Sequence, residues 1–264
     1  MPMDVLQGGF EYPTHLGNLG VTSVIILGLI IVSTKANILD KAGILSASLL
    51  GFVVGGMGHW SWLLILLGFL LSSHKATKWR FEEKMALGLS ESSDGHRSWG
   101  NVIANGGMPG LVAVYAFINE DWSNGLWLFS AAVAVAASDT FASEIGCLDS
   151  NVKLITTLQP CQQGINGGYS PSGQKAAALG SIIISVLTFC AWLIINIDSL
   201  ADNVVWGISA SITIAIIGFL GCQVDSVLGA VLENRGYLTK GSVNALAISF
   251  GMIAMATFLE YSPI

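Results

Sequence analysis

Long apolar runs recur along the whole chain, and each is about as long as the hydrocarbon core of a bilayer requires. Window hydropathy places these runs at roughly residues 16–34, 42–58, 60–74, 101–118, 125–146, 175–196, 203–221 and 241–260. A membrane span needs about 20 predominantly apolar residues. Only 11% of the residues are charged, against roughly a quarter in soluble domains. The sequence therefore predicts an all-α, polytopic transmembrane helical bundle of about eight spans, forming a single integral membrane domain over residues 1–264.

The basic residues favour one orientation in the membrane. With the spans above, one set of alternate loops carries all 11 lysines and arginines, and the other set carries none. Basic loops mark the cytoplasmic side, so both termini are expected on the outer side of the cell (inner) membrane. The loops at about 75–100, 147–174 and 222–240 are then cytoplasmic and are expected to build a site. The leader has no basic residue, which is the reverse of a signal peptide, and the net charge of −6 disfavours nucleic acid as a partner.

Three acidic residues lie at the cytoplasmic ends of apolar spans. Asp139 and Glu144 end the fifth span, and Asp225 ends the seventh. An acid deep in a bilayer costs about 2.5–3.5 kcal/mol, so it needs a partner, water or a metal ion; a lone acid near the interface can also snorkel outward. Hydroxyl groups such as Ser143 and Ser226 accompany these acids. Carboxylate and hydroxyl oxygens without histidine or cysteine suit a hard cation, above all Mg²⁺ with a phosphate-rich ligand.

The loop after residue 74 supplies cations that can neutralise phosphates. Lys75, Lys78 and Arg80 are the basic residues nearest to the membrane end of this loop. The charges that follow, over Glu82–Lys84, are interpreted instead as topology-setting charges that form helical Glu–Lys pairs.

A second loop, "TTLQPCQQGINGGYSPSG" from Thr156 to Gly173, is rich in glycine and leads directly into a helix. It carries Asn166, Ser170 and Ser172. Backbone N–H groups in such a loop and at a helix N-terminus bind phosphate well. A glycine-rich loop alone is more often only a turn, and this one is not a Walker A motif; its place beside the acids favours a phosphate-binding role.

Several of these segments together resemble a known family. "TKWRFEEKMALGLSE", "RSWGNVIANGG", "SDTFASEIG", "GINGGYS" and "VDSVLGAVLE" are similar, in this order over roughly residues 75–260, to the integral-membrane family that includes the plant phytyl-phosphate kinases. That family is related to the CTP-using phytol and dolichol kinases. The resemblance implies a Mg²⁺-dependent enzyme that transfers the γ-phosphoryl group of a nucleoside triphosphate, CTP, to an isoprenyl monophosphate such as phytyl or geranylgeranyl phosphate.

The resemblance also implies roles for individual residues. Asp139, Glu144 and Asp225 match the positions expected to hold Mg²⁺, and Lys78, Asn101 and Asn105 match polar positions near the nucleotide or the acceptor phosphate. The matching phosphate-binding loop comprises Thr156, Gly164, Asn166, Gly167, Gly168 and Ser170. Ile165 departs from the family, which more often has threonine there.

The site is expected where lipid and cytosol meet. The isoprenyl chain stays in the bilayer and CTP is cytosolic, and small-residue helix faces such as "AAVAVAAS" and "GSIIISV" are expected to pack closely and leave a groove for that chain. Two alternatives remain open. A membrane cytidylyltransferase that makes a CDP-lipid needs the same Mg²⁺ and CTP, and an ion-coupled carrier also uses intramembrane acids.

Overall fold

The chain forms a bundle of long helices with one short hairpin. The computed structural model describes residues 15–90, 92, 94–196 and 200–262. Its helices are α1 His15–Ala36, α2 Lys41–Val53, α3 Trp60–Lys78, α4 Phe81–Ala86, α5 Trp99–Asn119, α6 Trp122–Gly146, α7 Pro171–Ile195, α8 Leu200–Leu228 and α9 Lys240–Tyr261. Two π-helical turns, η2 Val54–Gly58 and η4 Gly229–Glu233, extend α2 and α8, and β1 Lys153–Leu154 pairs with β2 Gly168–Tyr169.

The expected apolar spans are all helices. Within the described residues, seven helices are long and apolar enough to cross a membrane, which confirms the predicted fold class. The remaining expected span, at 60–74, is α3, whose last two turns carry His74, Lys75 and Lys78 and so lower its hydropathy. The seventh span continues well past its predicted end at 221, since α8 and η4 run without a break to Glu233.

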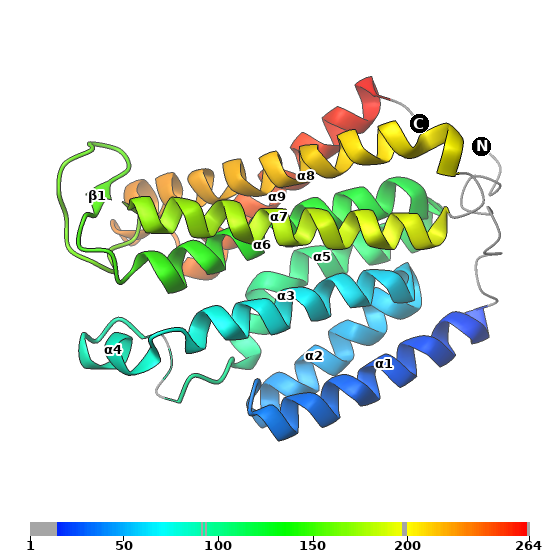
Figure 1. Cartoon of the computed structure of the whole chain (residues 1–264), viewed down its shortest axis with the longest axis horizontal. Coiled ribbons are helices and arrows are strands. Elements are labelled where there is room, and N and C mark those ends of the chain that lie inside the picture. The colour runs from blue at the N-terminus through cyan, green and yellow to red at the C-terminus, as the bar shows by residue number, and fades with distance from the viewer. Residues whose placement is uncertain (1–14, 91, 93, 197–199, 263–264) are drawn as a thin grey trace.

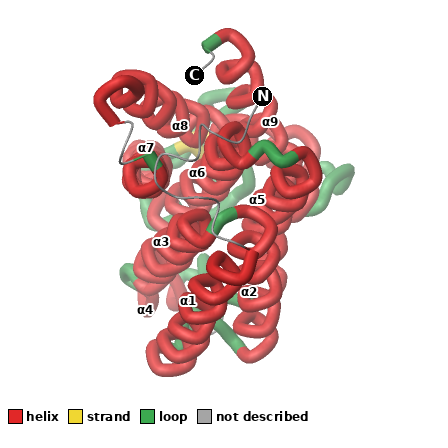
Figure 2. Tube along the Cα trace, turned by 90° about the vertical axis from the view of Figure 1, so that its right-hand side faces the viewer, coloured by secondary structure: helices red, strands yellow, loops and turns green. Residues whose placement is uncertain are grey.

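Helix α6 is the centre of the bundle and packs against α3, α5, α7, α8 and α9 (Figures 1 and 2). From Ala131 to Ala137 no side chain is more than 2% exposed. Small residues allow this: a Cβ on Gly218 of α8 would lie 2.8 Å from Ala134 Cβ. A Cβ on Gly180 of α7 would lie 2.7 Å from the Ala137 carbonyl oxygen. The close packing predicted from the small-residue runs is therefore confirmed.

The bundle has two different ends (Figure 1). Helix α4 and the β1–β2 hairpin gather at one of them, which we call the loop end, while α1 begins and α9 ends at the opposite end. At the opposite end, η2 breaks the regular α-helical pattern, and side chains from other helices complete its hydrogen bonds. Asn18 donates through Nδ2 to the Gly55 carbonyl at 2.6 Å, and Trp122 donates through Nε1 to the Met57 carbonyl at 3.0 Å.

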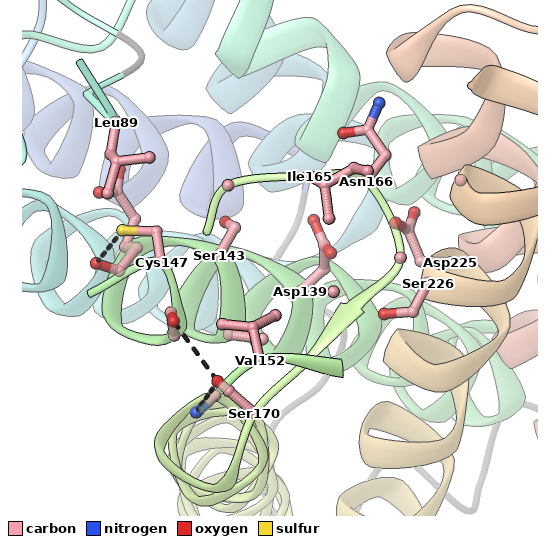
Figure 3. A pocket seen from close by; sticks show the side chains of 18 of the residues that line it. Leu89, Asp139, Ser143, Cys147, Val152, Ile165, Asn166, Ser170, Asp225 and Ser226 are labelled. Carbon is pink, nitrogen blue, oxygen red and sulfur yellow. Dashed lines mark hydrogen bonds between the residues drawn. The ribbon is translucent and has the colours of Figure 1, made fainter. Parts of the chain in front are cut away.

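At the loop end, the segment between α6 and α7 folds back on itself. Lys153 pairs with Tyr169 and Leu154 with Gly168 in an antiparallel register. This pairing returns the glycine-rich loop to the end of α6 just before α7 begins, which places the loop beside the acidic helix ends (Figure 3).

Candidate active site

A pocket of about 200 Å³ opens at the loop end. Its walls come from the end of α6, the glycine-rich loop, the start of α7, the α8–η4 segment and the first residue of α9, with Leu89 at the rim. Sequence reasoning singled out the following lining residues: Asp139, Glu144, Gly164, Asn166, Gly167, Gly168, Ser170 and Asp225. Of the three loops expected to build the site, the first contributes only Leu89.

Asp139 of α6 and Asp225 of α8 face each other across this pocket (Figure 3). Both carboxyl groups line the same pocket, and α6 and α8 pack directly against each other. The helices can approach this closely because α8 presents glycines to α6; a Cβ on Gly221 would lie 2.8 Å from Val135 Cγ1. Two carboxylates in one pocket repel each other, and a bound cation offsets that repulsion.

The glycine-rich loop covers the two acids and is fixed to α8. Gly164 and Gly167 have positive φ angles of 76° and 80°, so glycine suits both positions. A Cβ on Gly167 would lie 2.5 Å from Ala230 Cβ, and Asn234 donates through Nδ2 to the Asn166 carbonyl at 3.0 Å. The loop therefore rests directly on the π-helical turn η4, an irregularity that is frequent at functional sites.

The same loop presents backbone N–H groups that no described residue accepts from. The N–H groups of Ile165, Asn166 and Gly167 donate no hydrogen bond to the described part of the chain. Successive backbone N–H groups around a glycine with positive φ form a concavity that suits an anion. The loop is thus chemically prepared for a phosphate group.

At the N-terminus of α7, by contrast, the backbone N–H groups of Ser172 and Gly173 already donate hydrogen bonds to side chains of the protein. Ser170 accepts a hydrogen bond from Gly173 N at 3.2 Å, and Asp149 accepts from Ser172 N at 3.0 Å and from the Ser172 hydroxyl at 2.6 Å. These hydrogen bonds to its charged form hold the pKa of the Asp149 carboxyl below its ordinary value. Ser170 lines the pocket as expected, but it acts there as a helix cap.

Glu144 lines the pocket, yet its carboxylate is held by residues outside it. Lys84 Nζ lies 2.7 Å from Glu144 Oε2, and Thr77 donates its hydroxyl to Glu144 Oε1 at 2.6 Å. Lys84 also donates to the carbonyls of Ala76 and Thr77 at the end of α3, at 3.2 and 2.7 Å. Lys84 therefore does not form the helical Glu–Lys pair predicted for it: its side chain is fully buried and joins α3, α4 and α6.

Three predicted phosphate-binding cations lie outside the pocket. Lys78 donates to the Asp94 carbonyl at 2.8 Å, and Arg80 pairs with Glu83. Lys75 lies on α3 against a separate groove. The helical Glu–Lys pair expected in this loop is therefore not formed: Glu83 pairs with Arg80, and Lys84 pairs with Glu144.

Three predicted polar residues also lie elsewhere. Asn101 caps its own helix by accepting from Ser98 N at 3.1 Å. Asn101 and the buried Asn105 line a small cavity of about 60 Å³ among α1, α2, α3 and α5. Thr156 is exposed on the far part of the glycine-rich loop.

Sequence reasoning missed the only lysine or arginine among the pocket-lining residues, Lys240. Lys240 begins α9 and acts electrostatically on Asp225, as does Glu233 at the end of η4. Gln174 of α7 also lines the pocket. Asp225, Gly229 and Glu233 follow one another at i, i+4 and i+8, so the sequence places Glu233 on the same helix face as Asp225. Lys240 gives no such signal, because the basic residues of its loop were used only to assign the topology.

The donor set of the pocket fits Mg²⁺ through two carboxylates. Among the described residues, no three histidine, cysteine, aspartate or glutamate side chains form a group that could hold a metal ion. Mg²⁺ is commonly bound by one or two carboxylates together with substrate phosphates and water. Asp139 and Asp225, with Ser226 beside them, supply oxygen ligands of that kind. Glu144, the third expected ligand, is engaged with Lys84.

Fold and site together define a polytopic helical membrane protein with an acidic, loop-covered pocket at one end of its bundle. The chain belongs to the family described as Integral membrane protein DUF92, which matches residues 24–251.

Curated relatives cover most of the chain. It is 30% identical over 234 residues to "Uncharacterized membrane protein MJ0933" of Methanocaldococcus jannaschii, which covers 88% of this chain and 91% of the relative. It is 30% identical over 225 residues to "Uncharacterized membrane protein sll0875" of Synechocystis sp., with 81% and 82% covered. It is also 28% identical over 187 residues to "Protein PGR" of Arabidopsis thaliana, with 66% and 65% covered. No solved structure matches the chain.

Proposed function

We propose that this protein is a Mg²⁺-dependent kinase that uses CTP to phosphorylate an isoprenyl monophosphate, such as phytyl or geranylgeranyl phosphate. One observation carries the proposal: Asp139 and Asp225 line one pocket beneath a loop in which the N–H groups of Ile165, Asn166 and Gly167 donate no hydrogen bond to the described chain. Such a pocket combines a place for a divalent cation with a place for phosphate oxygens, as phosphoryl transfer requires.

The proposed reaction needs little covalent chemistry from the protein. A phosphate oxygen of the acceptor attacks the γ-phosphorus of CTP, the bond from that phosphorus to the β,γ-bridging oxygen breaks, and CDP leaves with the bond's electron pair. The acceptor is already an anionic nucleophile, so a strong general base is not required. Positioning and charge neutralisation are enough.

The pocket residues divide into three roles under this proposal. Asp139 and Asp225 would hold Mg²⁺, which supplies neutralisation of the phosphate charge when it is bound. The N–H groups of Ile165 to Gly167 bind phosphate oxygens, and Lys240 adds a positive charge on the η4 side. Glu144 keeps its carboxylate in the ion pair with Lys84 and shapes the wall.

The location of the pocket supports a reaction between a lipid and a soluble nucleotide. It lies between the ends of α6, α7 and α8 at the loop end. Helix α4 and the β1–β2 hairpin lie at the same end of the bundle (Figure 1). Because basic loops mark the cytoplasmic side, we infer that the pocket faces the cytoplasm of a cell (inner) membrane. An isoprenyl phosphate in the inner leaflet and cytosolic CTP both reach such a site.

The test is a product assay with the purified protein in detergent or nanodiscs. CTP labelled in either the α- or the γ-phosphate is incubated with geranylgeranyl or phytyl phosphate and Mg²⁺, and products are separated by chromatography. We expect γ-label in the isoprenyl diphosphate, α-label in CDP, and loss of both products after chelation with EDTA. Pyrophosphate with a CDP-lipid would instead identify a cytidylyltransferase, and no Mg²⁺-dependent product from either acceptor would overturn the proposal.

A further inference from the structure

The small cavity among α1, α2, α3 and α5 shares no lining residue with the pocket (Figure 2). Three of its lining residues are polar, namely Arg97, Asn101 and Asn105, and the others are leucines and further apolar or small residues. A buried water needs at least about 10–15 Å³ of such space. The cavity, at about 60 Å³, therefore has room for about four to six waters, or for one group of similar size such as a phosphate.

Arg97 is turned into this cavity, although it lies at the loop end of the bundle. Its N–H donates to the Ile38 carbonyl at 3.0 Å, and its carbonyl accepts from Asp40 N at 3.2 Å, which fixes it beside the end of α1. The side chain is buried, and the guanidinium carbon lies 5.7 Å from the centre of the Phe69 ring. An arginine at a membrane interface ordinarily extends its head toward water. This arginine instead brings a positive charge to a cavity that no described aspartate or glutamate lines.

Asn105 adds a buried amide that lacks a partner. It is 8% exposed, and its side chain makes no hydrogen bond with the described part of the chain. Asn101 lies one turn nearer to the loop end; its Oδ1 accepts from Ser98 N at 3.1 Å, and its amide nitrogen donates to no described residue. A buried amide without a partner is costly, so a bound group is expected here. Two amide donors beside a guanidinium group suit the oxygens of an anion.

The surroundings of the cavity favour a lipid as the source of that anion. The cavity lies in a seam, because α1 packs on α2 and α3 while α2 packs on α5. Deeper in the bundle the seam is closed, since a Cβ on Gly110 of α5 would lie 2.7 Å from Leu50 Cδ1. The outer face of α1 carries exposed side chains such as Leu27 and Ile31, as a lipid-facing helix does. Apolar walls stabilise the apolar part of an amphiphile and contribute nothing to a free inorganic anion.

We propose that this cavity binds the phosphate group of an anionic membrane lipid through Arg97 and the amide nitrogens of Asn101 and Asn105. The apolar part of the lipid lies against the leucines of the seam. The lipid is not a substrate: it is a bound component that fastens α1 and α2 to α3 and α5. The inference is independent of the proposed kinase function and concerns a different set of residues.

The first test measures binding to the full-length protein after lipid has been removed in detergent. Phosphatidylglycerol, a diacylglycerol with the same chains, and inorganic phosphate are titrated separately, and bound species are counted by native mass spectrometry. We expect one phosphatidylglycerol per protein, with a Kd at least about tenfold below that of either other ligand. Equal binding of the diacylglycerol would overturn recognition of the phosphate, and equal binding of inorganic phosphate would overturn the lipid as its source.

The second test removes the polar groups of the cavity one at a time. Asn105→Leu and Arg97→Met should each raise the Kd for phosphatidylglycerol about tenfold, the effect of losing one hydrogen bond to a charged group. The controls are Asn244→Leu, which changes a buried asparagine of α9, and Arg80→Met, which removes an exposed arginine that pairs with Glu83. Both controls should bind as the wild-type protein does. An unchanged Kd in folded Asn105→Leu would overturn the site and leave a water-filled cavity.

A third measurement tests the fastening role. Phosphatidylglycerol should raise the unfolding temperature of the wild-type protein and of Asn244→Leu, and should raise that of Asn105→Leu much less. An equal rise in all three proteins would overturn the role of the cavity. Specific lipid binding in a protein that makes no isoprenyl diphosphate would support this site and reject the kinase, whereas diphosphate formation without specific binding would reject this site alone.

Discussion

The two π-helical turns show how one backbone irregularity serves two purposes. At the opposite end of the bundle, η2 is enclosed by other helices: Asn18 bonds the Gly55 carbonyl and Trp122 bonds the Met57 carbonyl. At the loop end, η4 borders a pocket, and what covers it is a loop with unused N–H groups. The Gly55 and Met57 carbonyls of η2 accept hydrogen bonds from other helices, which indicates a structural role. The turn η4 instead borders unused N–H donors and two acids, which makes it part of the candidate site. We therefore expect changes near η4 to affect chemistry and changes near η2 to affect stability.

The largest effect is expected for the acids beside η4. Asp225→Asn and Asp139→Asn each remove a charge that stabilises the proposed site, and kcat should fall by roughly 10²–10³-fold or more. The measurement is Mg²⁺-dependent turnover of folded, monodisperse protein. Asp121→Asn is the matched control, since Asp121 caps α6 at the opposite end by accepting from Asn124 N and asparagine caps helices equally well. Wild-type turnover in both site variants would remove these aspartates from the mechanism.

Lys84→Met tests whether a residue at the loop end can affect stability, because Lys84 lies beside the pocket but does not line it. Removing one partner of a buried ion pair costs about 3–5 kcal/mol, since the other charge is left uncompensated. We expect this loss in the free energy of unfolding, measured by denaturation in mixed detergent micelles. The double variant Lys84→Met, Glu144→Gln should recover part of the loss, because it leaves no buried charge. If the double variant were no more stable than Lys84→Met, the loss of stability would not come from an uncompensated charge on Glu144.

The smallest effect is expected at η2. Asn18→Ala removes a buried donor to the Gly55 carbonyl and a buried acceptor for Trp60 N, which should lower the free energy of unfolding by about 1–3 kcal/mol. Turnover per folded molecule should not change. Ser23→Ala, which loses only a bond to its own helix, is the control for stability. A fall in kcat for Asn18→Ala would show that η2 is coupled to the pocket and would break the contrast.

The sequence predicted the helices well because hydropathy in a membrane protein is a long-range, averaged signal. The end of the seventh span was placed too early, since Gln223 and Asp225 lower the hydropathy of a helix that in fact continues into the pocket. Asp139 and Asp225, which the sequence predicts at the same membrane depth, line the same pocket. Their role as metal ligands stays a prediction.

Other parts of the site depend on contacts that no local pattern encodes. Lys84 lies in a charged stretch typical of an exposed helix, and only the fold of α4 against α3 and α6 buries it. Lys78 has a spacing and charge that suit phosphate, yet it is used to hold the Asp94 carbonyl. Lys240 is far from the other motifs in sequence, and it reaches the pocket because α9 begins beside η4.

The glycine-rich loop offers backbone N–H groups rather than side chains as donors, and this affects which substitutions the protein tolerates. A backbone N–H group is the same donor whatever side chain the residue carries. Ile165 therefore keeps the donor that threonine would have at this position. Gly164 and Gly167 resist replacement, because both have positive φ angles. The side chains of this loop can therefore vary widely while its backbone donors remain the same.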